Sequence, residues 1–411
     1  MNSNLKHIAI FYFLTAYTGI FAQLAPGIYC IGPSASYSPP SGPAYLNGAS
    51  PYPTITAALN DLQTNGATGN VIFELQNDYT STAEANPINI TYQGTASTSA
   101  TFRVRTDLST PLIIQKPRTN ANQLGVLNFS GADYITFDGT VNNTPCGNSF
   151  GLVVRNSGSL GQVISFNNDA THNSLKGLQV EIGHGSGIFI DYFGGVTGND
   201  YTEISCCKFN PRADLENTAG SHVGITTRDH TTADSKNDNI LIENNYFENC
   251  HQGIYANGVG NNGLWRILNN HFYKKNAAPS FSSFFLIKMT DTATINVEGN
   301  YFGGSAPFAG GAKMNINSMN YNSLMAGSLS QNVSSFSNNV FSNMATSAGS
   351  MQLLQISNSA FTVANNTVGN PSVSNDITSA FGFSFLTYIT NHLTNPVNIL
   401  NNTVSNISVP T

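Results

Sequence analysis

The chain is short of charged side chains. Asp, Glu, Lys and Arg together make up 9% of its 411 residues, whereas an ordinary globular chain has about 25%. The net charge is −6 and no run of basic residues occurs, which argues against nucleic acid as the main partner. Hydrophobic residues nevertheless make up 40% of the chain, so the low charge does not indicate disorder.

Grouped acids and metal-ligand spacings are also scarce. The 22 Asp and Glu residues are scattered, and neither an Asp-Asp dipeptide nor a Cys-x-x-Cys motif occurs. Glycoside hydrolases need a pair of carboxylates, and calcium and zinc sites need several ligands close together. The sequence therefore offers little support for a catalytic or metal-binding centre.

Long apolar stretches are confined to the N-terminus. A basic pair precedes the apolar run from Ile8 to Phe21, and a suitable cleavage point follows Ala22. This arrangement predicts a signal peptide over residues 1–22. A retained membrane anchor is the alternative, although the run is short for a membrane span. We therefore expect a mature chain that is secreted or held at the cell surface and has no membrane span.

Cysteine is sparse and odd in number, so at least one thiol stays unpaired. Export permits disulfides, but so few scattered cysteines do not form a disulfide framework. We interpret Cys206 and Cys207 as packing residues rather than as a redox pair, and leave the pairing open. The five cysteines are Cys30, Cys146, Cys206, Cys207 and Cys250.

A repeated pattern occupies the second half of the chain. Seven six-residue segments, such as Ile242–Phe247 and Ile267–Phe272, share one pattern. The first and sixth positions are apolar, the fourth is usually Asn, and the second, third and fifth vary. Successive units lie 25 to 39 residues apart. An uneven period of this size is typical of a solenoid whose coils carry loops of different length. The fourth position is occupied by Cys207, Asn245, Asn270, Asn300, Asn339, Asn366 and Asn402.

The spacing inside each unit predicts a bend. Apolar residues five positions apart would face opposite sides of a flat strand. Asn tolerates the left-handed backbone region, and its amide can bond to nearby backbone. We therefore expect two short strands joined by a tight Asn corner, with both apolar residues turned inward. Stacked coils would align the Asn side chains in a hydrogen-bonded ladder, so we interpret these Asn residues as structural.

The N-terminal part carries one amphipathic helix. Residues 23–52 are rich in Pro, Gly, Ser and Tyr and read as an irregular lead-in. Thr54 can cap the helix that follows and Gly66 can end it. Its apolar residues share one face, as a cap over the open end of a solenoid requires. They are Ile55, Ala58, Leu59 and Leu62.

Strands with alternating apolar residues follow from Val71 to Phe137, and the regular coils are expected from about Gly151. We divide the chain into a signal peptide (1–22), a lead-in with the capping helix (23–66) and a solenoid (67–411). The last unit has no capping helix after it. Because an uncapped end exposes strand edges, we expect either a truncated C-terminus or a partner that covers this end.

These segments resemble a known architecture. Residues 53–66 and 69–75 and the Asn units resemble the right-handed parallel β-helix of the pectin-lyase-like superfamily. Residues 27–32, 135–140 and 163–180 are similar to large secreted β-helix proteins of Gram-negative bacteria that use type IX export. The resemblance covers most of residues 27–406. It implies an all-β, right-handed parallel β-helix with an N-terminal amphipathic capping helix, but no single activity, because lyases, hydrolases and non-enzymatic surface proteins share this fold.

The densest polar cluster lies between residues 228 and 238. Arg228, Asp229 and His230 are the candidate catalytic residues, and Asp234 and Asp238 are candidate calcium ligands beside Asn neighbours. A solvated surface loop is the alternative that we favour, because a charge cluster by itself is weak evidence of a site. The triplet Gly183-His184-Gly185 is similar to part of the polygalacturonase pattern, but we interpret it as a glycine-rich turn.

Two classes of function follow. We favour a non-catalytic adhesion, glycan-binding or structural module whose partner is a polysaccharide or cell-surface glycan, without a cofactor unless calcium binds. Tyr246 and Tyr301, expected to point outward, could stack sugar rings, although Tyr is also a good strand former. The alternative is a carbohydrate-active enzyme, a lyase or hydrolase of acidic polysaccharide. It would require three or more ionisable groups to converge in one groove.

Overall fold

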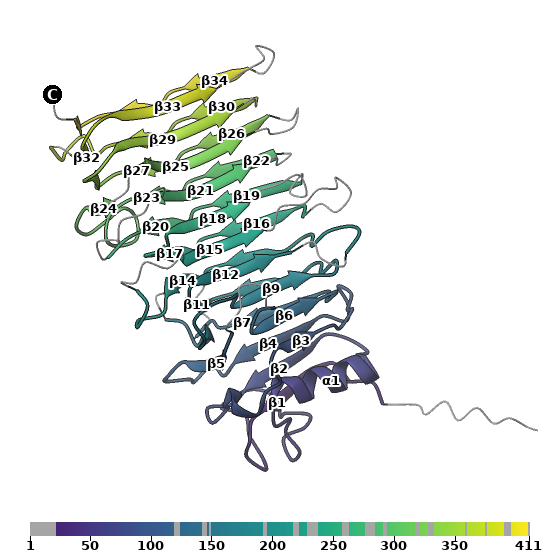
Figure 1. Cartoon of the computed structure of the whole chain (residues 1–411). Helices are drawn as coiled ribbons and strands as arrows, with labels where there is room; N and C mark the ends of the chain where they lie inside the picture. Colours follow the sequence, from purple (N-terminus) through teal and green to yellow (C-terminus); the bar gives the residue numbers. More distant parts are fainter. Residues whose placement is uncertain are drawn as a thin grey trace, which may run out of the picture.

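The computed structural model describes residues 22–118, 124–141, 146–147, 149–191, 195–216, 222–227, 237–256, 263–275, 284–290, 294–316, 320–327, 333–357, 360–374, 376–389 and 396–409. Within these ranges the chain winds into a parallel β-helix, a stack of coils along one axis (Figure 1). Each regular coil adds one strand to each of three long sheets. The expected all-β parallel β-helix is confirmed.

The first sheet contains the strands that precede the Asn corners. In spatial order these are β1 (Gly27–Ile31), β2 (Val71–Leu75), β4 (Ala100–Val104), β7 (Ile135–Asp138), β10 (Ser174–Lys176), β13 (Glu203–Ser205), β16 (Ile240–Glu243), β19 (Leu264–Leu268), β22 (Thr294–Glu298), β26 (Ser334–Ser337), β30 (Phe361–Ala364) and β34 (Val397–Leu400).

The second sheet contains the strands that follow the corners. They are β5 (Leu112–Lys116), β8 (Leu152–Asn156), β11 (Leu178–Ile182), β14 (Lys208–Pro211), β17 (Tyr246–Glu248), β20 (His271–Tyr273), β23 (Tyr301–Phe302), β27 (Val340–Phe341), β31 (Thr367–Val368) and β35 (Thr403–Val404).

The third sheet closes each coil. Its strands are β3 (Ile88–Ile90), β6 (Leu127–Ser130), β9 (Ile164–Asn167), β12 (Gly185–Ile190), β15 (His222–Thr227), β18 (Gln252–Ala256), β21 (Phe284–Thr290), β25 (Asn320–Gly327), β29 (Ser350–Ser357) and β33 (Phe383–Ile389). A short fourth sheet joins β24 (Met314–Ile316), β28 (Met344–Thr346), β32 (Ile377–Ser379) and β36 (Ile407–Ser408).

The coils are stacked in register, so equivalent repeat positions lie above one another. Ile242 pairs with Ile267 in the first sheet, and Phe247 pairs with Phe272 in the second. Both apolar positions of the repeat are buried in every unit except the last, where Ile399 and Val404 are exposed. Stacked rings fill one side of the core with centroids 4.7 to 5.0 Å apart. The rings belong to Phe209, Phe247, Phe272, Phe302 and Phe341.

Glycines of the third sheet make room for these rings. A Cβ atom on Gly224 would lie 2.6 Å from the ring of Phe247 and 2.5 Å from the carbonyl oxygen of Gly253. Gly187 and Gly253 approach the rings of neighbouring coils in the same way. The phenylalanine column and the glycine column therefore depend on each other.

The N-terminal helix α1 (Ile55–Asn65) forms as expected and covers apolar residues of the first coils (Figure 1). The Thr54 side chain accepts a hydrogen bond from the Ala57 amide, and Gly66 ends the helix at a φ of 71°. The Glu84 carboxylate, after the short 3-10 helix η1 (Ser81–Ala83), accepts from the amides of the first helical turn. A carboxylate at this end also complements the helix dipole.

The expectation of an irregular lead-in over residues 23–52 is wrong in part. β1 pairs in parallel with β2, with Ile31 opposite Leu75. Tyr29 and Ile31 are buried while Ile28 is half-buried. The first sheet therefore begins at Gly27, and stacked coils are present well before Gly151. None of the helices in the described ranges is long and apolar enough to cross a membrane.

Candidate functional site

The two residues at each Asn corner have different structural roles. The third residue of each unit, such as Asn244 or Asn269, has a left-handed φ between 52° and 68°. The fourth residue forms the ladder and is buried in every unit except the last, where Asn402 is half-buried. The Asn245 Nδ2 donates to Asn270 Oδ1 at 3.0 Å and to the Ile204 carbonyl at 2.8 Å. Corresponding contacts join Asn270, Asn300, Asn339, Asn366 and Asn402. The ladder amides are engaged inside the protein and are not available to a ligand.

The polar loop of residues 228–238 lies only partly within the described residues. Arg228, Asp229, His230 and Asp234 lie outside the described residues. Asp238 is described, and its Oδ1 accepts hydrogen bonds from the amides of the next residue at 2.7 Å and of Leu264 at 2.6 Å. Among the residues that the structure covers, no three His, Cys, Asp or Glu side chains are grouped to hold a metal. The catalytic and calcium assignments therefore stay predictions.

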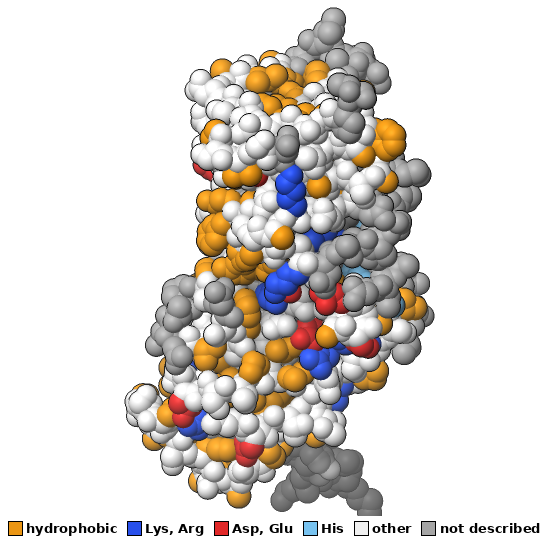
Figure 2. Space-filling model, turned by 90° about the vertical axis from the view of Figure 1, so that its left-hand side faces the viewer, with side chains coloured by type: hydrophobic (Ala, Val, Ile, Leu, Met, Phe, Trp, Pro, Cys, Tyr) orange, Lys and Arg blue, Asp and Glu red, His pale blue; other side chains and the backbone are white. Residues whose placement is uncertain are grey.

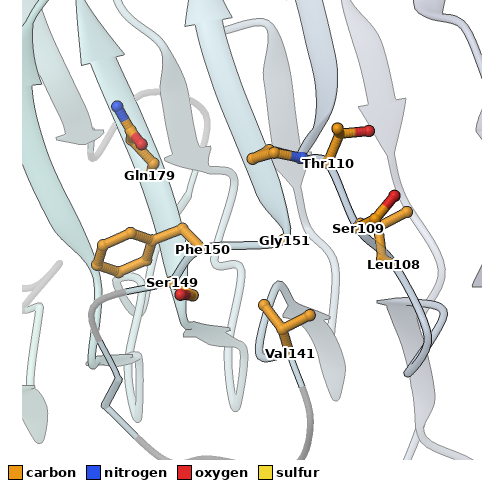
Figure 3. A pocket seen from close by; sticks show the side chains of 9 residues that line it. Leu108, Ser109, Thr110, Val141, Ser149, Phe150, Gly151 and Gln179 are labelled. Atoms are coloured by element: carbon orange, nitrogen blue, oxygen red, sulfur yellow. The ribbon is translucent and has the colours of Figure 1, made fainter.

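Three pockets lie on the outer face of the second sheet, and we call their combined surface the groove. The first pocket, of about 420 Å³, lies between the segment Leu108–Pro111 and the segment Ser149–Gly151. Figure 3 shows Phe150 and Gln179 on one side of it and Leu108, Ser109 and Thr110 on the other.

The other two pockets continue the groove. One, of about 330 Å³, shares Phe150 and Gln179 with the first pocket and is further lined by Lys208, Tyr246, Glu248, Tyr273, Lys275 and Pro307. The other, of about 440 Å³, lies where β8 and β11 end and is lined by Gln115, Arg155, Ser157, Glu181, Arg212, Ala213 and Asp214. Figure 2 shows acidic and basic side chains gathered in the middle of this side of the molecule.

The charged side chains of the groove are paired with one another. Glu248 Oε2 lies 2.8 Å from Lys275 Nζ and accepts from the Tyr273 hydroxyl, while its Oε1 lies 3.3 Å from Lys208 Nζ. Burial by itself raises the pKa of Glu248, but the hydrogen bond from Lys275, the charge of Lys208 and the Tyr273 hydroxyl outweigh burial and lower it. Glu248 is therefore held as a carboxylate whose two oxygens are both engaged.

A second polar network lies on the N-terminal side. Arg155 pairs with Glu181 across neighbouring strands. Gln179 Nε2 donates to Glu181 Oε1 at 3.0 Å and to Asn210 Oδ1 at 3.2 Å. Arg212 forms a two-pronged ion pair with Asp214. Four ionisable groups therefore line one pocket, as the enzyme alternative requires, because the stacking of coils brings together residues that are far apart in the sequence.

An aromatic column continues the groove towards the C-terminus. The rings of Tyr246, His271 and Tyr301 stack on successive strands, with centroids 5.1 and 5.2 Å apart. Burial lowers the pKa of His271 to about 4, so the imidazole is neutral near pH 7. Tyr246 and Tyr301 lie on the outer face, as the sequence predicts.

Two loops border this face. The segment between β7 and β8 replaces the usual two-residue corner, and the disulfide Cys146–Cys206 joins it to the corner before β14. The Tyr246 hydroxyl donates to the Cys146 carbonyl at 3.5 Å. The remaining cysteines, Cys30, Cys207 and Cys250, are buried thiols. The interpretation of Cys206 as a packing residue is wrong, whereas Cys207 is buried beside the Asn ladder.

The second loop, residues 303–312, follows β23 and folds over the outer face of the second sheet. Ala306 and Gly310 form an antiparallel bridge at its base. The Asn343 side chain donates to the carbonyl oxygens of Gly311 and Ala312 at 2.8 and 3.1 Å. Pro307 of this loop lines the central pocket.

Sequence reasoning missed the groove, although a signal for part of it was present. Lys208, Tyr246, His271 and Tyr301 all occupy the fifth position of the repeat, directly after the ladder residue. Because the coils are in register, this position forms one column on the outer face. Lys275, Arg155 and Phe150 carry no comparable signal, since they lie outside the repeated units.

No known family model matches the chain, and no curated protein matches it. Among solved structures, the chain is similar to one described as the crystal structure of PfbA, a surface adhesin of Streptococcus pneumoniae. The similarity has 12% sequence identity, covers 87% of this chain and 88% of that chain, and has a TM-score of 0.38. At these values it carries no argument about function, and the assignment of the fold rests on the strand pairing of this chain itself.

Proposed function

We propose that this protein is an exported β-helix that binds an extended carbohydrate chain along the groove without cleaving it. The observation that carries the proposal is the group of three pockets on one outer sheet face. Two of them share Phe150 and Gln179, and Gln179 donates a hydrogen bond to Glu181, which lines the third. A group of adjoining open pockets suits an elongated ligand better than a compact one. Aromatic rings beside amide and hydroxyl groups offer both the apolar and the hydrogen-bonding contacts that sugars need.

The pairing of the charges supports binding over catalysis. Glycoside hydrolysis needs a protonated carboxyl with a raised pKa beside a second, available carboxylate. Glu248 instead has a lowered pKa and is surrounded by Lys208, Lys275 and Tyr273. Glu181 is engaged by Arg155 and Gln179. These carboxylates hold the cations and amides of the groove in fixed positions, which favours recognition of a ligand.

We infer that the site of action is the cell surface or the surrounding medium. The support is the signal-peptide pattern of residues 1–22 and the low charge of the chain. An adhesion role follows if the glycan bound by the groove belongs to a neighbouring cell or matrix. Export through a type IX system belongs to the same proposal and rests on the sequence resemblance alone.

The proposal can be tested by titrating the mature chain with soluble β-glucan, mannan, polygalacturonate and alginate oligomers and measuring heat of binding. We expect binding of at least one polymer. Gln179→Trp should abolish it, because an indole would fill the junction of two pockets. Gln355→Trp, a half-buried glutamine on β29 of the third sheet, is the matched control and should bind as the wild type does.

Turnover separates the two classes of function. Incubation with the same polymers, followed by measurement of reducing ends and of unsaturated products, should show no cleavage. Cleavage that disappears in Asp229→Ala or His230→Ala would establish the lyase or hydrolase alternative. Binding that survives Gln179→Trp would place the ligand elsewhere on the molecule.

A further inference from the structure

An exposed aromatic residue stands at the C-terminal end of the groove. Phe308 has 63% of its surface exposed to solvent, whereas most of the strand Phe residues whose burial is described are buried in the core. Its neighbour Pro307 lines the central pocket. The Phe308 ring also lies edge-on against His271, with centroids 4.3 Å apart, and against Tyr301 at 5.2 Å. The ring thus extends the groove beyond the pocket.

The backbone that carries this ring is strained. Phe308 has a φ of 59° and Ala309 a φ of 53°, a region that side chains other than Gly, Asn and Asp rarely adopt. Strain of this kind persists where the surrounding structure holds it in place. Here the Phe308 amide donates a hydrogen bond to His271 Nδ1 at 3.1 Å. The Asn343 side chain holds the other end of the loop.

A core role does not account for this arrangement. Burial would be the ordinary reason to place a large apolar ring, yet most of this ring is in contact with solvent. A turn that only had to connect β23 to β24 could carry Gly or Asn at these positions without strain. The chain instead presents a phenyl face next to a polar pocket.

We infer that Phe308 is a ligand-contacting, specificity-determining residue that stacks against a pyranose ring of the carbohydrate in the groove, and that His271 positions it. This inference rests on the proposed function. An aromatic face is electron-rich and attracts the weakly positive C–H groups of a sugar ring. The ring occupies the end of the groove, so it adds a subsite beyond the pocket of Lys208, Tyr246 and Glu248.

The test compares Phe308→Ala, Phe308→Tyr and the wild type in titrations with β-glucan, mannan and polygalacturonate hexamers. We expect Phe308→Ala to weaken binding roughly tenfold, the equivalent of about 1.4 kcal/mol, and Phe308→Tyr to bind within about threefold of the wild type, since a sugar can stack on either ring. Phe381→Ala removes another exposed ring, 75% exposed and distant in sequence, and should leave affinity unchanged.

His271→Phe gives a readout that does not depend on a ligand. It keeps an aromatic ring in the column but removes the acceptor for the Phe308 amide. Hydrogen exchange at residues 305–311 should then become faster, and binding should weaken, while the melting curve of Phe308→Ala stays close to that of the wild type.

The outcomes separate the two proposals. If the wild type binds a hexamer and Gln179→Trp does not, but Phe308→Ala binds as the wild type does, the role of Phe308 is refuted and the groove stands. Equal loss of affinity in Phe381→Ala would likewise refute a specific role for Phe308. If the wild type binds none of the polymers, both proposals fall.

Discussion

At the scale of single residues, the repeat combines two kinds of buried contact: amide ladders at the corners and aromatic stacks in the core. Both depend on in-register stacking, and both place one residue of each coil directly on its equivalent in the next. A substitution in either column is therefore felt in two neighbouring coils.

Asn270→Ala should destabilise the fold by about 1–3 kcal/mol, because a buried carbonyl and a ladder amide lose their partners. The affected bonds run from Asn270 Nδ2 to the Ile242 carbonyl at 2.9 Å and to Asn300 Oδ1 at 3.0 Å. Urea unfolding followed by circular dichroism measures the change. Asn296→Ala, on the outer face of β22, is the control and should stay within about 0.5 kcal/mol of the wild type.

Gly224→Ala should be costly although it adds a single methyl group. The new Cβ would collide with the Phe247 ring and the Gly253 carbonyl, and overpacking of this kind costs about 1–3 kcal/mol. A double variant, Gly224→Ala with Phe247→Leu, should recover part of the loss if the clash with the ring is the cause. If the double variant recovers no stability, the clash with the Gly253 carbonyl causes the loss.

Stability should fall on acidification because of two buried histidines. Burial, together with electrostatic repulsion from the neighbouring His184, His251 and Lys274, lowers the pKa of His222 to about 4, and burial lowers that of His271 to about 4. Below about pH 6.5 the unfolded chain binds protons that the folded chain does not, so stability is lost between about pH 6.5 and pH 4, on the order of 3 kcal/mol per histidine.

The measurement is the melting temperature between pH 7.5 and pH 4. His222→Gln should flatten the profile, whereas His172→Gln, which replaces an exposed side chain, should leave its shape unchanged. A profile of the wild type that is flat over this range would contradict the burial of both imidazoles.

At the scale of elements, the Glu84 carboxylate ties the first turn of α1 to the first coils, in addition to the packing of the apolar face of the helix. Glu84 accepts hydrogen bonds from the amides of Ile55 and Thr56 and from the Tyr79 hydroxyl. Glu84→Gln should reduce stability by about 1.5–3 kcal/mol, the range for hydrogen bonds to a charged group. Amide exchange in residues 55–65 should become faster. Glu298→Gln, an exposed acid on β22, is the control, and an equal effect there would contradict the role of Glu84.

Elements were predictable where local pattern and fold agree. Alternating apolar residues identified β2 and β4, and the capping residues Thr54 and Gly66 identified α1. β1 escaped prediction because its five residues stand among Pro, Gly and Ser and pair only with a strand beyond the helix. Only its long-range pairing with β2 identifies β1, so no rule based on local sequence detects it.

At the scale of the whole molecule, the groove was not predictable for a related reason. Arg155, Glu181 and Glu248 come from different coils, and the loops between those coils vary in length. Only the register of the second sheet brings them to one face. The repeat predicts that a ribbed outer face exists, but not which residues of the intervening loops border it. Phe150 and Pro307 belong to such loops.

The disulfide gives the stack of coils a mechanical asymmetry. It joins residues 60 positions apart in the chain and spans the coils between β7 and β14. If the ends of the protein were pulled apart, coils outside the disulfide would unfold and lengthen one after another. The 60 residues enclosed by the disulfide could not extend, so their contour length of roughly 200 Å would become available only after a reductant cleaved the bond. Under tension, the segment beside the groove would therefore be the last to lengthen.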